Sequence, residues 1–314
     1  MTLDIRPLTE EDLSAADRIF RLAFGTFLGL PDPMAFMGDA DLVRPRWRAA
    51  PEATLGAYDA TGLVGSNFVT RWGSFGFFGP LTVRPDLWDR GIARALLGET
   101  MALFERLGTR QMALFTFPQS AKHVGLYQSF GFWPQALTPV MAKAVAPAEP
   151  PPPDMALLSR LAADERARAH EEIGRLTNAV MPGLDLAGEI AAAAAQGLGD
   201  TVLVREGGAL AAMAVCHVGA GSEAGSGAAY VKFGAARPGK DAARAFERLL
   251  AACEAFARER GAERLVAGVN SARREAYRAL LARGYRTVLQ GVAMQRPDAP
   301  GTTRADCYVL DDWR

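Results

Sequence analysis

The feature that most constrains the fold of this chain is an internal repeat with a constant spacing. The tripeptide "VRP" ends at Pro85, and "ARP" ends at Pro238, which lies 153 residues later. The same spacing separates three further matching pairs: Gly108 and Gly261, Gly131 and Gly284, and Met141 and Met294. Four anchors over about sixty residues without a gap are typical of two copies of one fold on one chain.

A proline-rich segment separates the two copies. The stretch "AKAVAPAEPPPPDM", residues 142–155, contains Pro147 and a run of four prolines at 150–153. Such a run cannot continue a helix or a central strand, and it is typical of a stiff, extended linker. We therefore expect a first domain at residues 1–145, a linker at 146–154 and a second domain at 155–314.

The apolar periodicity of each copy alternates between that of strands and that of helices. In the first copy, we expect strands at 4–8, 54–59, 63–72, 77–83, 111–117 and 136–145, and helices at 9–24, 91–108 and 120–131. The second copy follows the same order. This pattern predicts an α/β (α+β) fold in which each domain is a mixed, twisted sheet flanked by helices. We expect the two domains to pack as an intrachain pseudo-dimer, and a homodimer remains open.

The composition argues against several classes of protein. The 35 Lys and Arg residues balance the 35 Asp and Glu residues, so no positive field gathers nucleic acid or anionic lipid. Neither a membrane-spanning run nor the pattern of a signal peptide is present, and we expect a cytoplasmic protein. The three cysteines and three histidines are scattered, which predicts neither disulfides nor a metal site.

The stretch "LTVRPDLWDRGIARALLGETM", residues 81–101, turns sharply from a strand into a helix. The N-terminus of a helix carries partial positive charge and unpaired backbone N–H groups, which together favour a bound phosphate. Gly91 lets the chain approach such a group with no Cβ in the way, and Ala93 is also small. Arg90 and Arg94 can add charge-assisted contacts. This turn therefore predicts a diphosphate site.

These residues, together with "LYQSFGF" at 126–132, resemble the acetyl-CoA-binding core of the GNAT superfamily of N-acetyltransferases. The resemblance covers most of residues 1–145 and is weaker over 155–314. It implies that acetyl-CoA is bound by Leu81, Thr82, Val83, Trp88, Asp89, Arg90, Gly91, Ile92, Ala93, Arg94 and Ser120. In the family the loop begins with Arg or Gln, where this chain has Trp88, and this position contributes mainly its backbone N–H.

The resemblance also implies a catalytic residue. The family has an Asn seven residues before a Tyr, and Gly-Phe four residues after that Tyr. Here these places hold Ser120, Tyr127 and Gly131 with Phe132. The family's tyrosine protonates the leaving thiolate, and a phenol with an ordinary pKa of about 10 suits an acid. His123, one turn before Tyr127, is expected to be a partly exposed helix residue.

The second copy lacks the residues that carry this chemistry. At a spacing of 153, Arg244 replaces Gly91, Phe246 replaces Ala93 and Leu280 replaces Tyr127. We therefore expect a degenerate copy with a structural or substrate-shaping role. Gly239 and Lys240 leave weak anion binding open.

The expected activity is transfer of an acetyl group from acetyl-CoA to a primary amine of a small molecule or peptide. The alternative is a non-catalytic CoA-binding or regulatory protein. Aromatic and apolar residues in the acceptor region indicate either an apolar acceptor or core packing: Phe24, Phe27, Leu30 and Phe36. The sequence shows no general base beyond a water relayed to Asp32 or Asp39.

Overall fold

The computed structural model describes residues 3–146 and 151–314. The strands of the first half are β1 (Asp4–Pro7), β2 (Thr54–Asp59), β3 (Gly62–Trp72), β4 (Phe75–Phe78), β5 (Thr82–Val83), β6 (Gln111–Thr116) and β7 (Trp133–Ala144). Its helices are α1 (Leu13–Phe27), α2 (Val43–Ala49), α3 (Ile92–Arg106) and α4 (Ala121–Gln128), with short 3-10 turns η1 (Glu10–Asp12), η2 (Pro33–Ala35), η3 (Pro51–Ala53) and η4 (Pro85–Leu87).

The second half is built from the same kinds of element. Its strands are β8 (Met155–Leu157), β9 (Gly199–Glu206), β10 (Ala209–Gly219), β11 (Gly225–Ala236), β12 (Arg264–Gly268), β13 (Arg286–Arg296) and β14 (Val309–Leu310). Its helices are α5 (Ala163–Val180), α6 (Ala187–Ala195), α7 (Ala242–Glu259) and α8 (Arg274–Ala282), with the 3-10 turn η5 (Leu158–Arg160).

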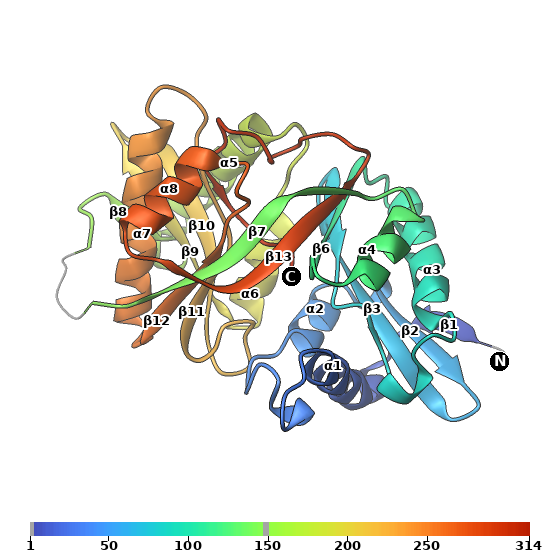
Figure 1. The fold of residues 1–314 in the computed structure, drawn as a ribbon. Helices are drawn as coiled ribbons and strands as arrows, with labels where there is room; N and C mark the ends of the chain where they lie inside the picture. Colours follow the sequence, from blue (N-terminus) through green and yellow to red (C-terminus); the bar gives the residue numbers. More distant parts are fainter. Residues whose placement is uncertain (1–2, 147–150) are drawn as a thin grey trace.

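All of these strands belong to one mixed sheet that runs through both halves (Figure 1). Along the sheet the order is β1-β2-β3-β4-β6-β13-β7-β12-β11-β10-β9-β8, with β5 attached to β3 and β14 to β11. Helices pack on the sheet, as the sequence predicted. The chain therefore has the expected mixed α/β architecture, although the two halves share a single sheet.

The pairing of the strands repeats with the spacing found in the sequence. In the first half, Phe75 of β4 pairs in parallel with Gln111 of β6. In the second half, Ala228 of β11 pairs in parallel with Arg264 of β12, and each of these residues lies 153 positions after its counterpart. The repeat in the sequence thus corresponds to a repeat in hydrogen-bond register.

The halves exchange their last strands. β13 of the second half pairs with β6 of the first, with Ala293 opposite Phe115, while β7 of the first half pairs with β12 of the second, with Val140 opposite Gly268. β7 and β13 also pair with each other along most of their length, and Figure 1 shows them side by side across the middle of the molecule. Each half is therefore completed by a strand from the other.

Two predicted elements need correction. The segment 77–83 is two strands, β4 and β5, separated by three residues, because Pro80 cannot donate to a ladder and Gly79 has a φ of 145°. The first helix begins later than residue 9, after the 3-10 turn η1, although Asp12 does accept a hydrogen bond from the backbone N–H of Thr9 (2.9 Å) as a first-turn acid can.

Other predictions concern the linker, the cysteines and the membrane. Residues 147–150 of the predicted linker lie outside the described residues. The three cysteines are buried and free, as expected of core residues, and the sulfurs of Cys216 and Cys253 are 4.0 Å apart. Among residues 3–146 and 151–314, no helix is both long enough and apolar enough to cross a membrane.

Candidate active site

The site is organised by a bend between β4 and β5. β4 pairs on one side with β3 and on the other with β6, but β5 pairs only with β3 among the described strands. At the bend, the backbone N–H of Gly79 donates to the carbonyl of Phe68 (2.8 Å). Beyond it, one edge of β5 has no strand partner. The sheet is thus open between β5 and β6.

The alternation of backbone groups along β5 determines which N–H and C=O groups face its open edge. The N–H of Arg84 donates to the carbonyl of Val64 on β3 (2.9 Å), so the N–H and C=O of the preceding residue, Val83, point away from β3. The Val83 carbonyl accepts a hydrogen bond from the indole Nε1 of Trp88 (2.8 Å). This hydrogen bond links the loop that follows β5 back to the strand, a contact that was not predicted from the sequence.

The loop between β5 and α3 contains two residues with left-handed backbone. Asp89 has a φ of 66° and Gly91 has a φ of 84°. Gly91 is the N-cap of α3 and no side chain caps the helix there. A Cβ placed on Gly91 would meet no atom of the chain within 4 Å, so open space lies above this glycine. The first-turn N–H groups of α3, which have no partners within the helix, begin at this opening.

Charged side chains surround this opening. Lys122, at the start of α4, forms an ion pair with Asp89 and so offsets the negative charge within the loop. The guanidinium of Arg94 lies 5.5 Å from the centre of the Phe130 ring, and Arg90 is exposed. The predicted cofactor residues Leu81–Val83 and Trp88–Arg94 therefore lie together around the open edge of β5 and the N-terminus of α3.

Ser120 and His123 hold the start of α4. Ser120 is the N-cap of this helix, and its hydroxyl accepts a hydrogen bond from the backbone N–H of His123 (3.4 Å). The His123 ring is half-buried 5.0 Å from the ring of Phe27. Burial, with a smaller effect of neighbouring Lys122, lowers the pKa of His123. It is therefore a neutral packing residue at neutral pH.

Tyr127 lies in the last turn of α4 and is 8% exposed. Its ring centre is 5.8 Å from that of Phe78, the last residue of β4 before the bend. Burial raises the pKa of Tyr127, against a smaller opposing effect of the Thr116 side chain at the end of β6. The structure thus brings a phenol that stays protonated to the place where β5 diverges from β6.

Aromatic rings line the region between α1 and α4. Phe24 stacks on Phe36 at 5.3 Å, and Phe27 lies 5.1 Å from Phe117, which follows β6. Phe117 also lies 6.2 Å from Phe24 and so joins the two pairs, and Leu30 is half-buried too. Phe24, Phe27 and Phe36 therefore form a half-buried aromatic wall.

Asp32 and Asp39 both have structural partners. Asp32 caps η2 by accepting from the backbone N–H of Met34 (3.0 Å). Asp39 accepts hydrogen bonds from the hydroxyl and the N–H of Ser226 in the second half, and these bonds lower its pKa. Neither carboxylate is placed as a general base by these contacts.

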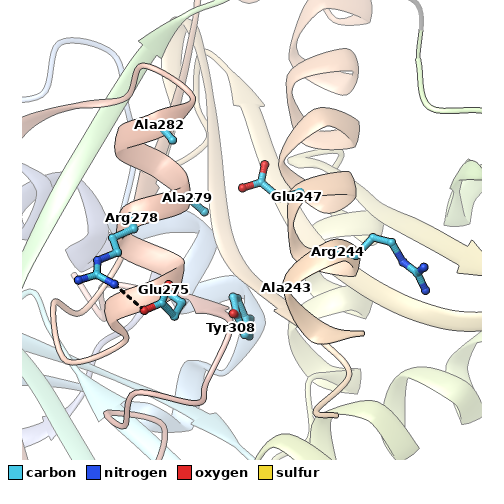
Figure 2. A pocket seen from close by; sticks show the side chains of 8 residues that line it. All are labelled: Ala243, Arg244, Glu247, Glu275, Arg278, Ala279, Ala282 and Tyr308. Atoms are coloured by element: carbon cyan, nitrogen blue, oxygen red, sulfur yellow. Dashed lines mark hydrogen bonds and ion pairs between the residues drawn. The ribbon is translucent and has the colours of Figure 1, made fainter. Parts of the chain in front are cut away.

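The corresponding place in the second half is an open pocket of about 390 Å³ between α7 and α8 (Figure 2). It is lined by Ala243, Arg244, Glu247, Glu275, Arg278, Ala279, Ala282 and Tyr308. At the 153-residue spacing, Glu247 stands where the first half has Arg94, and Glu275 stands where it has Lys122. Two cationic positions of the first half have thus become acidic.

The side chains of this second pocket are also arranged differently. Figure 2 shows Glu247 directed into the space between the helices and Arg244 directed away from α8. Glu275 accepts a hydrogen bond from Arg278 (2.9 Å), and Arg244 forms ion pairs with Glu206 and Asp241. Leu280, in the place of Tyr127, is fully buried and carries no hydroxyl.

One residue at the first site was missed from the sequence. Arg46 of α2 donates a hydrogen bond to the carbonyl of Gly79 at the bend (2.5 Å). No spacing or motif in "VRPRWRA" distinguishes this arginine from its neighbours. Its role depends on partners more than 170 residues away, which only the folded chain brings to it.

Comparisons with known proteins bear on the family and the fold. The model of the acetyltransferase (GNAT) family matches residues 20–132. The fold resembles a candidate acetyltransferase from Pyrococcus horikoshii, with a TM-score of 0.72 and 15% identity, over 99% of this chain and 95% of that one. It also resembles a GCN5-related N-acetyltransferase from Sphaerobacter thermophilus, with a TM-score of 0.63 and 14% identity, over 94% of this chain and 95% of that one.

A third similar structure is a GCN5-related N-acetyltransferase from Anabaena variabilis, with a TM-score of 0.54 and 13% identity, over 94% of this chain and 72% of that one. The comparison with curated proteins gave no match. At these identities the structures show a shared fold, and the family model locates the family's domain. Residues 20–132 thus match the acetyltransferase (GNAT) family, and nearly the whole chain shares its fold with the first two structures.

Proposed function

We propose that this protein transfers an acetyl group from acetyl-CoA to a primary amine, and that the first half carries the site. The observation that carries the proposal is the unpaired edge of β5. Along the chain this strand follows Phe78, whose ring packs against Tyr127, and precedes the N-terminus of α3. The residues fit the cofactor, because Gly91 leaves open space above first-turn N–H groups and Arg90 and Arg94 lie beside them.

Bound acetyl-CoA supplies an acyl group that is already activated as a thioester. In our proposal, the N-terminus of α3 holds the diphosphate, together with Arg90, Arg94 and Ser120 at the edge of the site. The backbone of Leu81–Val83 orients the pantetheine arm, as an added strand would be oriented. The N–H groups on this edge also stabilise the charge that develops on the carbonyl oxygen.

Tyr127 is the proposed general acid. The neutral amine attacks the thioester carbon directly, the carbon–sulfur bond breaks, and the phenol gives its proton to the leaving sulfur. The nitrogen loses one proton to solvent as the amide forms, and solvent returns a proton to the phenolate. The raised pKa of Tyr127 keeps that proton available at neutral pH. Positioning of the two reactants contributes much of the remaining acceleration.

The acceptor approaches, in this proposal, past the aromatic wall of Phe24, Phe27 and Phe36. These rings favour a primary amine on a molecule or peptide with an apolar part. The second half, proposed as residues 155–314, binds no acetyl-CoA because Arg244, Glu247 and Glu275 replace Gly91, Arg94 and Lys122.

Release of free thiol from acetyl-CoA, measured with a panel of primary amines, tests this proposal. For the amine with the highest rate, Tyr127→Phe should lower kcat about 100-fold and leave the affinity for acetyl-CoA unchanged, because only the acid is lost. Tyr277→Phe removes a half-buried phenol of the second half and serves as the matched control, with kcat as in the wild type.

Two results would contradict the proposal. Binding of acetyl-CoA without thiol release for any amine in the panel would favour the non-catalytic alternative. Thiol release with an unchanged kcat in Tyr127→Phe would keep the enzyme but remove this tyrosine from its mechanism.

A further inference from the structure

The bend between β4 and β5 is held by a buried arginine. Arg46 is 7% exposed and donates its Nη1 hydrogen to the Gly79 carbonyl. Gly79 lies directly between Phe78, the last residue paired into β4, and the segment that leads to β5. The position of Arg46 therefore bears on where the open edge of β5 begins.

The second half supplies the counter-charge of this arginine. Glu223, in the loop between β10 and β11, accepts from Arg46 Nε (2.9 Å) and Nη2 (2.8 Å) in a two-point contact. We call this pair of bonds, from Nε and Nη2 of Arg46 to the Glu223 carboxylate, the fork. Two such bonds fix the orientation of a guanidinium as well as its position. The Nη2 group also donates to the backbone carbonyl of Arg314.

A second cation fixes the carboxylate. Lys232 of β11 donates to both oxygens of Glu223, at 2.8 and 2.7 Å, and its ammonium lies 5.4 Å from the centre of the Phe77 ring in β4. Glu223 and Lys232 are each 3% exposed. Burial opposes ionisation of Glu223, but Arg46 and Lys232 outweigh it and hold its pKa well below the ordinary range.

We infer that Arg46 is a positioning residue for acyl transfer, which fixes the β4–β5 bend against Glu223 and Lys232 of the second half. The inference rests on the proposed function of the bend. The second half would then have a defined role. Its residues Glu223 and Lys232 would hold the β4–β5 bend of the first half in place.

The buried ion pair between Arg46 and Glu223 matters for the geometry of the bend rather than for net stability. A buried ion pair contributes little net stability but is costly to break, so its members are confined to one arrangement. A shift of about 1 Å in a reacting group can lower a rate about 100-fold. Loss of the fork should therefore affect turnover more than it affects cofactor binding.

Arg46→Lys tests this inference, because lysine keeps the charge but cannot make the fork and the contact with Gly79 together. The matched control is Arg273→Lys. Arg273 is also a buried arginine, and it donates hydrogen bonds to Asp311 and to the carbonyls of Thr302 and Val309, all in the second half. Both variants should lower Tm, and kcat and KM are measured well below both Tm values.

We expect Arg46→Lys to lower kcat about 10-fold or more with little change in the KM for acetyl-CoA, while Arg273→Lys keeps kcat within about twofold of the wild type. Hydrogen–deuterium exchange over residues 79–83 gives a readout that is independent of turnover. It should be faster in Arg46→Lys and unchanged in Arg273→Lys.

An unchanged kcat and unchanged exchange in Arg46→Lys would overturn the inference, as would equal losses in both variants. If Arg46→Lys does not fold, Glu223→Asp, which draws the carboxylate back from the fork, should show the same pattern of lowered kcat and faster exchange. If the wild type binds acetyl-CoA but releases no thiol, the proposed function fails, and the exchange alone then decides whether Arg46 holds the bend.

Discussion

At the scale of single residues, burial decides the chemistry that Tyr127 can perform. The phenol is enclosed by Phe78 and the end of β6, and this burial raises its pKa above the ordinary value. A group with a raised pKa holds its proton over the whole physiological range. Tyr127 is thus suited to give a proton to a thiolate and unsuited to take one from an amine.

The raised pKa of Tyr127 predicts how kcat depends on pH. An acid acts in its protonated form, so activity that depends on Tyr127 is lost only as the pH rises through its pKa, above the ordinary value of about 10. We therefore expect kcat, measured with saturating amine from pH 7 to pH 10, to show no alkaline fall that depends on Tyr127. A fall centred near pH 8 in the wild type that is absent in Tyr127→Phe would contradict this.

The residues that could be predicted from the sequence are those with a local signal. Gly91 and Tyr127 are each identified by neighbours within ten residues. In the structure Gly91 has a left-handed backbone with open space above it, and Tyr127 is buried beside Phe78. The contact of Trp88 with the Val83 carbonyl was not predicted, because tryptophan departs from the family pattern there. Arg46 carried no signal, since its partner Glu223 lies 177 residues away.

At the scale of elements, the strands and helices of both copies were largely predicted because their periodicity is local. The division of the segment 77–83 into two strands was not predicted. Apolar residues on both sides of Gly79 and Pro80 make the segment resemble one continuous strand. The exchange of β7 and β13 was not predicted either, because strand pairing depends on chain far away in sequence. Equivalent strands from two similar copies can pair in either way.

Glu254 of α7 secures one exchanged strand. It accepts hydrogen bonds from Lys143 of β7 (2.8 Å) and from Arg283 (3.0 and 2.9 Å), and it is 4% exposed. Burial opposes its ionisation, but the bonds from Arg283 and Lys143 lower its pKa. The carboxylate thus links a strand of the first half to a helix of the second.

Glu254→Gln should lower the free energy of unfolding at pH 7 by about 3 kcal/mol, because two cations lose their buried partner. Because the pKa of Glu254 is lower in the folded protein, its ionised carboxylate stabilises the fold above about pH 4.3, the ordinary carboxyl pKa. This stabilisation is lost as the pH falls through the lower pKa that Glu254 has in the folded protein. Urea unfolding should therefore show a difference between variant and wild type that narrows below about pH 4.

Glu263→Gln changes an exposed glutamate and is the control for this measurement. Its free energy of unfolding should match that of the wild type at both pH 7 and pH 3. A difference between Glu254→Gln and the wild type that is as large at pH 3 as at pH 7 would show that the charge of Glu254 is not the source of its effect.

At the scale of the whole molecule, two copies of one fold share a sheet but differ in charge at equivalent positions. The first half has Gly91, with open space above it, Arg94 and Lys122 at these positions, and the second half has Arg244, Glu247 and Glu275. An anionic cofactor is attracted by the first set and meets acidic side chains in the second. We therefore propose that one chain binds one acetyl-CoA, in its first half.

Calorimetric titration with acetyl-CoA tests this claim most directly, using the wild type, Gly91→Trp and the matched variant Arg244→Trp at the equivalent position. We expect one site per chain in the wild type and in Arg244→Trp, and no binding in Gly91→Trp, where an indole fills the space above the helix N-terminus. Two sites per chain, or binding that survives Gly91→Trp and is lost in Arg244→Trp, would contradict the account.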